Sequence, residues 1–257
     1  MTVVETYEPT GALKPVTDGV WVVDGPVIGF GYLGLRFPFP TRMTIVRLAD
    51  SGLWVHSPTE LPPALKREVD AVGPVRHLIA PNRIHYWWVE DWAAAYPDAI
   101  TFAAPGVRQQ ARRKGRFADY HADLAEDGAY PWSGDLKMLL VPGGYLTEAV
   151  FSHDASRTLV MTDLIQNYER QKIASLFFRF MARLSGAVDP DGKMPFDLRM
   201  TFFRHRKRLT EAVRTMIPWQ PQRLIFAHGR WYEEDAVAEL KRAFRWLPGI
   251  APDVSQP

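Results

Sequence analysis

The sequence predicts a layered α/β fold, and three observations support this prediction. A meander of short apolar strands occupies the first third of the 257-residue chain. Segments with a helical period are then followed by buried strands, twice in succession, as in layered α/β proteins. A β-hairpin, an inserted helical pair and a closing amphipathic helix complete the order. Apolar residues make up 47% of the chain and charged residues 23%, as is typical of a well-filled globular core.

The first strands are predicted by apolar, β-branched segments bounded by turn residues, at 19–24, 43–48 and 52–56. Between the first two lies GPVIGFGYLGLRFPFPT, which is rich in Gly, Pro and aromatic residues. We expect this stretch to be a loop with a packed apolar lining.

Helix and strand alternate in the next part of the chain. Capping candidates and prolines begin a helical pattern over residues 57–72, which leads to a buried strand at 75–80. A second short helix is predicted at 90–96. A strand at 99–103 follows the Pro97–Asp98 turn.

The second half begins with predicted strands at 138–141, 148–151 and 158–162, of which the last two form a hairpin around Asp154–Ser156. Two apolar helical segments at 172–184 and 207–216 follow, separated by AVDPDGKMP, and they predict a helical insertion over about residues 165–217. A strand at 223–227 and a helix at 233–246 close the chain.

Composition and charge exclude several classes of protein. The chain has no cysteine, which excludes disulfides, thiolate ligands and a cysteine nucleophile. The formal charge of +2 and the interleaving of basic with acidic residues argue against a nucleic-acid partner. The densest basic run, Arg204–Arg208 with the nearby Arg199, is interpreted as a solvated helix face, and an anion-binding patch is the alternative.

The N-terminus and the hydropathy pattern bear on location. The first residues carry Glu5 and Glu8 and lack the basic and apolar regions of a secretory signal. No run of about 18 apolar residues suggests a membrane span. We therefore expect a cytoplasmic protein of a single domain, residues 1–257, with no membrane partner.

Several phrases resemble a bacterial family of unknown function, DUF4336, and through it the metallo-β-lactamase superfamily. The resemblance covers roughly residues 8 to 248. It implies a metallo-β-lactamase-like αββα sandwich, into which the helical pair is inserted. The phrases are GPVIGFGYLGLRFPFPTRMTIVRL, HSPTEL, APNRIHYWW, TDLIQNYE and FAHGRWY.

The superfamily, as the resemblance implies, holds one or two metal ions. Its ligands are a His-x-His-x-Asp-His loop, a further His, an Asp that ends the hairpin and a last His before Gly. Neutral imidazoles and carboxylates bind Zn or Fe and leave a position for water, whose pKa falls to about 7 when it is bound.

The ligand loop is degenerate in this chain. Aligned without a gap, Asn82, Ile84, Tyr86 and Trp87 would fill the four ligand positions. With one residue inserted, His85 takes the second His position, and we prefer this alignment.

The two ligands at strand ends match directly, as Asp163 and His228, whereas Gly144 stands at the position of the middle His. His85, Asp163 and His228 form a two-His, one-carboxylate set, which suffices for one Zn or Fe ion with open positions. The alternatives are a structural His85 packed beside tryptophans and an Asp163 that caps a following helix.

Glu148 follows Gly144 by four residues and is a candidate catalytic base or fourth ligand, with a surface strand position as the alternative. Asn82, Tyr86 and Trp87 are candidate substrate-binding residues. Rings gathered on the ligand loop favour an apolar or planar small molecule, although core packing is the usual role of aromatic residues.

We therefore expect a metal-dependent hydrolase-like protein with a reduced site of at most one Zn or Fe ion. The alternative is a non-catalytic ligand-binding or scaffold protein that keeps the fold and has lost its metal. The helical insertion either covers the site or forms a homodimer face.

Overall fold

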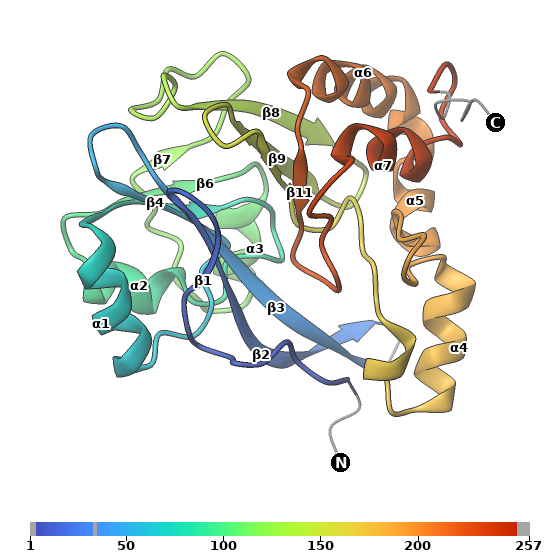
Figure 1. Ribbon diagram of the computed structural model, residues 1–257, viewed down its shortest axis with the longest axis horizontal. Helices are drawn as coiled ribbons and strands as arrows, with labels where there is room; N and C mark the ends of the chain where they lie inside the picture. The colour runs from blue at the N-terminus through green and yellow to red at the C-terminus, as the bar shows by residue number, and fades with distance from the viewer. Residues whose placement is uncertain (1–3, 33–34, 251–257) are drawn as a thin grey trace. The chain divides into compact units, whose positions relative to one another are not determined.

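The structure is a computed structural model that describes residues 4–32 and 35–250 (Figure 1). The chain divides into two compact units, Met1–Asp135 and Leu136–Pro257. Each unit contains one β-sheet with its own helices. A single domain over residues 1–257 stays a prediction.

The N-terminal unit is built on a seven-stranded sheet in the order β1-β2-β3-β4-β5-β6-β7. The first four strands pair antiparallel and the last four pair parallel. Helices α1, α2 and α3 connect the parallel strands, as such connections require. The elements are β1 (Lys14–Thr17), β2 (Val20–Tyr32), β3 (Leu35–Arg47), β4 (Leu53–His56), α1 (Pro63–Val72), β5 (Val75–Ala80), α2 (Val89–Ala95), β6 (Ile100–Ala103), α3 (Val107–Arg113) and β7 (Ala122–Asp123).

The core of this unit joins the sheet to the helices α1 and α2. Leu65 and Val69 of α1 and Trp92 of α2 are fully buried with apolar side chains of β3, β4 and β5. The indole N–H of Trp92 donates to the carbonyl of Thr59 at 2.7 Å, which ties α2 to the segment before α1. Because β5 is anchored in this way, the loop that follows it has a fixed starting point.

The expected loop between the first two strands is wrong for the described residues. β2 and β3 continue as a long antiparallel pair, with Val27 opposite Pro40 and Gly29 opposite Pro38. Both prolines fall on alternate residues of β3, so their missing N–H groups can point away from β2. β4 pairs only with Thr44–Arg47, and the proline segment therefore has no ladder on its other side to lose. Residues 33 and 34 lie outside the described residues.

The C-terminal unit has a four-stranded sheet in the order β11-β10-β9-β8. The predicted hairpin is confirmed as the antiparallel pair β9 and β10, and β10 pairs parallel with β11. The strands are β8 (Leu136–Pro142), β9 (Thr147–His153), β10 (Thr158–Val160) and β11 (Arg223–Ile225).

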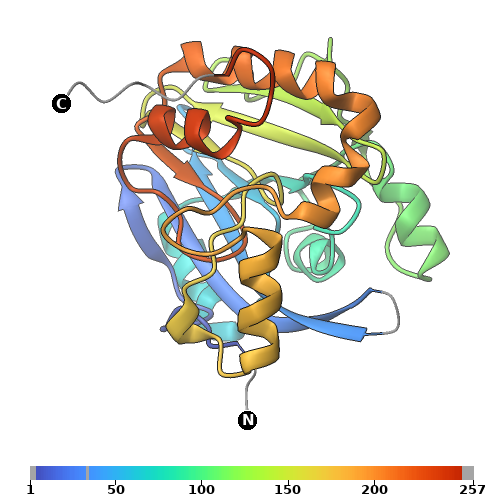
Figure 2. The same ribbon diagram turned by 90° about the vertical axis from the view of Figure 1, so that its right-hand side faces the viewer.

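The predicted insertion contains its two expected helices and a third, shorter one. These are α4 (Leu176–Ser185), α6 (Arg206–Met216) and the additional α5 (Phe196–Thr201). α6 packs on β8, whereas α4 extends away from α6 and from α7 (Ala236–Ala243) in both views (Figures 1 and 2). Short 3-10 turns complete the unit at Arg170–Lys172, Phe203–His205 and Ile217–Trp219.

No helix in the described part of the chain is both long enough and apolar enough to cross a membrane.

Candidate metal site

Asp163 and His228 lie at the carboxyl ends of neighbouring parallel strands. Two backbone hydrogen bonds extend the pairing of β10 with β11: Met161 donates to Ile225 at 2.9 Å, and Ala227 donates to Thr162 at 3.3 Å. Carboxyl ends of parallel strands meet at one edge of a sheet. Asp163 and His228, each the next residue along its segment, are therefore brought side by side.

Asp163 is held in place by Glu148 of β9. The two carboxylate oxygens of Glu148 accept the backbone N–H groups of Thr162 at 2.6 Å and of Asp163 at 2.9 Å. Glu148 is fully buried, so the alternative of a surface strand position is wrong. Hydrogen bonds to a buried carboxylate are among the stronger ones in proteins. Glu148 therefore fixes the backbone at the point where the Asp163 side chain leaves the strand.

His228 is held by the loop that follows Asp163. Asn167 donates its backbone N–H to the carbonyl of His228 at 3.0 Å, and its own carbonyl accepts the N–H of Arg230 at 2.8 Å. Gly229 between them has φ +92°, and a Cβ atom there would lie 2.0 Å from the Asn167 carbonyl oxygen. Only glycine fits this close approach, which explains the His-Gly pair of the sequence.

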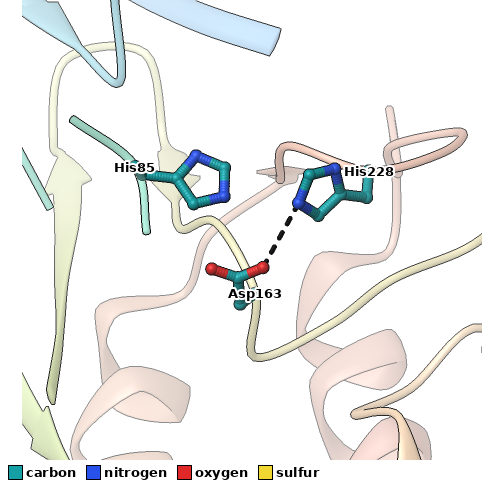
Figure 3. A group of neighbouring side chains, drawn as sticks. All are labelled: His85, Asp163 and His228. Atoms are coloured by element: carbon teal, nitrogen blue, oxygen red, sulfur yellow. Dashed lines mark ion pairs between the residues drawn. The ribbon is translucent and has the colours of Figure 1, made fainter. Parts of the chain in front are cut away.

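The two side chains form a buried pair. Oδ1 of Asp163 lies 3.2 Å from Nε2 of His228, and both side chains are at most 5% exposed (Figure 3). Two donor atoms about 2.0–2.2 Å from one tetrahedral Zn ion would be roughly 3.3–3.6 Å apart. The observed separation is close to that geometry. The same contact is a hydrogen bond when Nε2 carries a proton, so the pair alone does not require a metal.

The alternative role of Asp163 as a helix cap is wrong. In the described part of the chain, the next helical segment after Asp163 begins at Arg170, with Glu169 at its N-cap position. The carboxylate instead contacts His228 and accepts a long hydrogen bond of 3.4 Å from the side chain of Gln166.

His85 belongs to the N-terminal unit, in the loop after β5. Asn82 organises this loop, since its side-chain oxygen accepts the backbone N–H groups of Ile84 at 2.8 Å and of His85 at 3.1 Å. Nδ1 of His85 lies 2.8 Å from Oγ of Ser57, and His85 is buried. When Nδ1 donates this bond, the ring carries its lone pair on Nε2, the arrangement that a metal-bound histidine needs.

The other candidate residues of the loop also have structural contacts. Tyr86 is buried, and the indole N–H of Trp87 donates to the carbonyl of Ile84 at 2.9 Å. The guanidinium of Arg116 lies 4.4 Å from the Trp87 ring centre. Substrate binding by Asn82, Tyr86 and Trp87 stays a prediction.

Gly144 stands where the resemblance to the superfamily places the middle His, and the backbone of α5 leaves no room for a side chain there. The N–H of Gly144 donates to the carbonyl of Thr201 at 3.0 Å, and a Cβ atom would lie 2.6 Å from that oxygen. At Gly143, a Cβ atom would lie 2.5 Å from the buried ring of Phe202. No side chain fits here unless the end of α5 moves.

Sequence reasoning missed the residues that support the candidate ligands. Ser57 stood within the phrase HSPTEL and Asn167 within TDLIQNYE, but neither residue type signals a supporting role by itself. Ser57 has φ +54°, which is uncommon for a residue other than glycine. Its contact with His85 spans 28 positions, and no local pattern predicts such a pairing.

Three comparisons with known proteins bear on the family and the fold of the chain. The model of the family DUF4336, described as a domain of unknown function, matches residues 18–197. A search of curated proteins finds no match.

Solved metallo-β-lactamase structures resemble the chain along nearly its whole length. DIM-1 metallo-β-lactamase exposed to ceftazidime has a TM-score of 0.63 at 11% identity, covering 95% of this chain and 97% of that one. The enzyme from Hirschia baltica has a TM-score of 0.58 at 17% identity, covering 90% and 94%. FIM-1 from Pseudomonas aeruginosa in its mono-zinc form has a TM-score of 0.55 at 14% identity, covering 96% and 99%. The predicted metallo-β-lactamase-like α/β fold is thereby confirmed.

Proposed function

Because the chain belongs to the DUF4336 family and has the metallo-β-lactamase fold, we propose that it is a metal-dependent hydrolase with a single metal ion, held by His85, Asp163 and His228. The buried Asp163–His228 pair, with its separation of 3.2 Å, is the observation that carries this proposal. Two imidazoles and one carboxylate suit Zn or Fe(II).

The third ligand of the proposal, His85, is supported by its burial and by the contact that orients its ring. His85 belongs to the N-terminal unit, Asp163 and His228 to the C-terminal unit, and all three side chains are buried. Ser57 at Nδ1 of His85 favours metal binding through Nε2.

The site is limited to one ion by the closure at Gly144. A second metal would need further ligands, and the Thr201 carbonyl occupies the space that a side chain at Gly144 would take. A bound Zn or Fe ion supplies a water of lowered pKa and polarises a substrate bond.

Glu148 acts mainly as a positioning residue in this proposal. Both of its oxygens already accept backbone N–H groups, which orient Asp163. Each carboxylate oxygen has a second lone pair, so its use as a base or fourth ligand stays a prediction.

Metal analysis tests the proposal. The full chain is loaded with Zn(II) or Fe(II), desalted and measured by mass spectrometry of the elements, next to His85→Ala, Asp163→Ala and His228→Ala. His205→Ala and Asp127→Ala serve as matched controls, since neither residue belongs to the ligand set. We expect about one ion per chain in the parent and controls, and at least a tenfold loss of affinity in each ligand variant.

Hydrolysis is tested separately with activated carboxyl esters and phosphodiesters, before and after chelation. Turnover that disappears with chelator and in Asp163→Ala supports the hydrolase. A parent chain that binds no stoichiometric metal would refute the proposal and favour the alternative of a ligand-binding or scaffold protein.

A further inference from the structure

Exposed apolar side chains gather on one segment of the C-terminal unit. Among the described residues, nine large apolar side chains are exposed, and seven of them lie between residues 176 and 203. Soluble proteins seldom keep such a group of apolar side chains in water without a partner. We refer to these seven as the apolar helical face: Leu176, Phe177, Phe180, Leu184, Phe196, Met200 and Phe203.

Helix α4 forms without burying any residue. Ser175 at its N-cap accepts the N–H of Phe178, and Gly186 ends it in the left-handed conformation. A helix of ten residues is normally stabilised by an apolar face packed on the rest of the protein. None of the α4 residues is buried, and the apolar side chains of Leu176 and Leu184 are 77% and 67% exposed. The caps fix the two ends of the helix, while its apolar face stays exposed to solvent.

The apolar residues of α4 form one stripe, with an arginine at its border. At about 100° per residue, positions 176, 177, 180 and 184 fall within an arc of roughly 100°. The exposed Arg183 falls about 20° outside this arc. Helices that lie in a membrane interface have this arrangement: their apolar residues enter the acyl region, and basic residues beside them stay at the level of the lipid phosphates.

The charge of the same segment is strongly positive. Residues 170–208 contain ten Lys and Arg and three Asp, a formal charge of +7, whereas the whole chain carries +2. The basic run Arg204–Arg208 directly follows the last residue of the apolar helical face. A second copy of this chain would bring the same positive charge against it, and like charges oppose that contact. An anionic surface would be attracted.

We propose that the apolar helical face and the basic residues around it dock this protein on an anionic phospholipid membrane. The expectation of no membrane partner rests on the absence of a membrane span, and an interfacial helix needs none. The proposal is independent of the metal site, because none of its residues belongs to the candidate ligands.

Vesicle sedimentation of the full chain tests the proposal. Vesicles of phosphatidylcholine alone are compared with vesicles that also contain phosphatidylglycerol, at low and at high salt. We expect partition onto the anionic vesicles only, weakened by salt. Arg183→Glu together with Arg204→Glu reverses two charges and should lower partition by about fivefold or more per site. Phe180→Ser with Leu184→Ser should lower it by more than about tenfold.

Matched variants carry the same changes elsewhere on the surface. Ile100→Ser replaces an exposed apolar side chain outside the segment, and Arg112→Glu reverses an exposed charge on α3. Both should bind anionic vesicles like the parent.

Three results would overturn the proposal. The first is no partition onto anionic vesicles at low salt, and the second is partition that the variants in the segment leave unchanged. The third is a parent dimer in sedimentation velocity that Phe180→Ser with Leu184→Ser converts to monomer, without vesicle binding, which would assign the face to a second copy.

Discussion

Replacing Glu148 by glutamine should weaken the fold at the strand end that carries Asp163. In the parent, one buried carboxylate accepts the N–H groups of Thr162 at 2.6 Å and of Asp163 at 2.9 Å. Glutamine keeps one carbonyl oxygen and turns an NH₂ group toward the other N–H. One hydrogen bond is lost, and the remaining one loses its charge assistance.

The magnitude follows from these two bonds. A hydrogen bond to a charged group contributes about 1.5–3 kcal/mol, and an unsatisfied buried donor costs about 1–3 kcal/mol. We expect Glu148→Gln to lower the free energy of unfolding by about 2–4 kcal/mol. With a urea m-value of roughly 3 kcal/mol per molar, the midpoint should fall by about 1 M.

Urea unfolding measures the effect, with Glu211→Gln as the matched control. Glu211 lies on the exposed side of α6, where such a change should stay within about 0.5 kcal/mol. Amide hydrogen exchange gives a local reading, because protection of the Thr162 and Asp163 N–H groups should fall first. Equal midpoints for the two variants would refute the role of Glu148 as the support of this strand end.

Three further predictions concern stability. Gly229→Ala should lower the free energy of unfolding by about 2 kcal/mol or more, because φ is +92° and the new Cβ would lie 2.0 Å from the Asn167 carbonyl oxygen. Gly134→Ala, where the new Cβ meets open space, should leave stability nearly unchanged in the same thermal unfolding assay. Arg42→Met should lower the free energy of unfolding by about 2–4 kcal/mol in urea, since it removes the buried guanidinium 2.7 Å from Asp24 and leaves that carboxylate with Lys14 at 2.9 Å. Arg47→Met, whose partner Asp18 is fully exposed, should cost less than about 1 kcal/mol, and similar losses in the two variants would contradict this reasoning. Burial of His77 lowers its pKa below the usual 6.5, so the unfolded chain binds this proton more readily than the folded chain does. The contribution of neutral His77 to the free energy of unfolding is therefore present above about pH 6.5 and is lost as the pH falls toward the folded-state pKa. His77→Phe should flatten the slope of unfolding free energy against pH in this range.

The order of strands and helices could be predicted because their periods are local properties of the chain. The strand predicted at 75–80 has the same bounds as β5, since a continuous buried run between turn residues has few other interpretations. The sequence does not predict α3, because only Val107 and Ala111 of its seven residues are buried and the helical spacing of apolar residues is therefore weak. α5 lies in a stretch interrupted by proline, and its short length gives the same difficulty.

The long β2–β3 hairpin shows where local reasoning fails for a different reason. Gly and Pro disfavour a strand taken by itself, but here the two segments stabilise each other by pairing over their whole length. Proline costs little where a strand has a partner on one side only. The relevant information is the pairing, and the composition of either segment alone does not contain it.

The candidate ligands could be anticipated at strand ends, but their support could not. Asp163 and His228 follow short apolar strands, and the parallel pairing of β10 with β11 brings them to one edge. The burial of Glu148 and the clamp of Asn167 on Gly229 depend on contacts between distant segments. A charged residue on a strand is usually exposed, and the hydrogen bonds that Glu148 accepts from the N–H groups of Thr162 and Asp163 help to offset the cost of its burial.

The loss of the middle ligand is coupled to the helical insertion. The end of α5 lies so close to the Gly143–Gly144 turn that the Thr201 carbonyl accepts the Gly144 N–H, while the ring of Phe202 fills the space beside Gly143. A histidine at position 144 would therefore need the end of α5 to move, and a single substitution cannot restore it. The two strand-end residues are under no such constraint, because Glu148 and Asn167 hold their backbones independently of α5. The proposal of a single metal ion fits this closure, and the segment that closes the turn also carries residues of the apolar helical face.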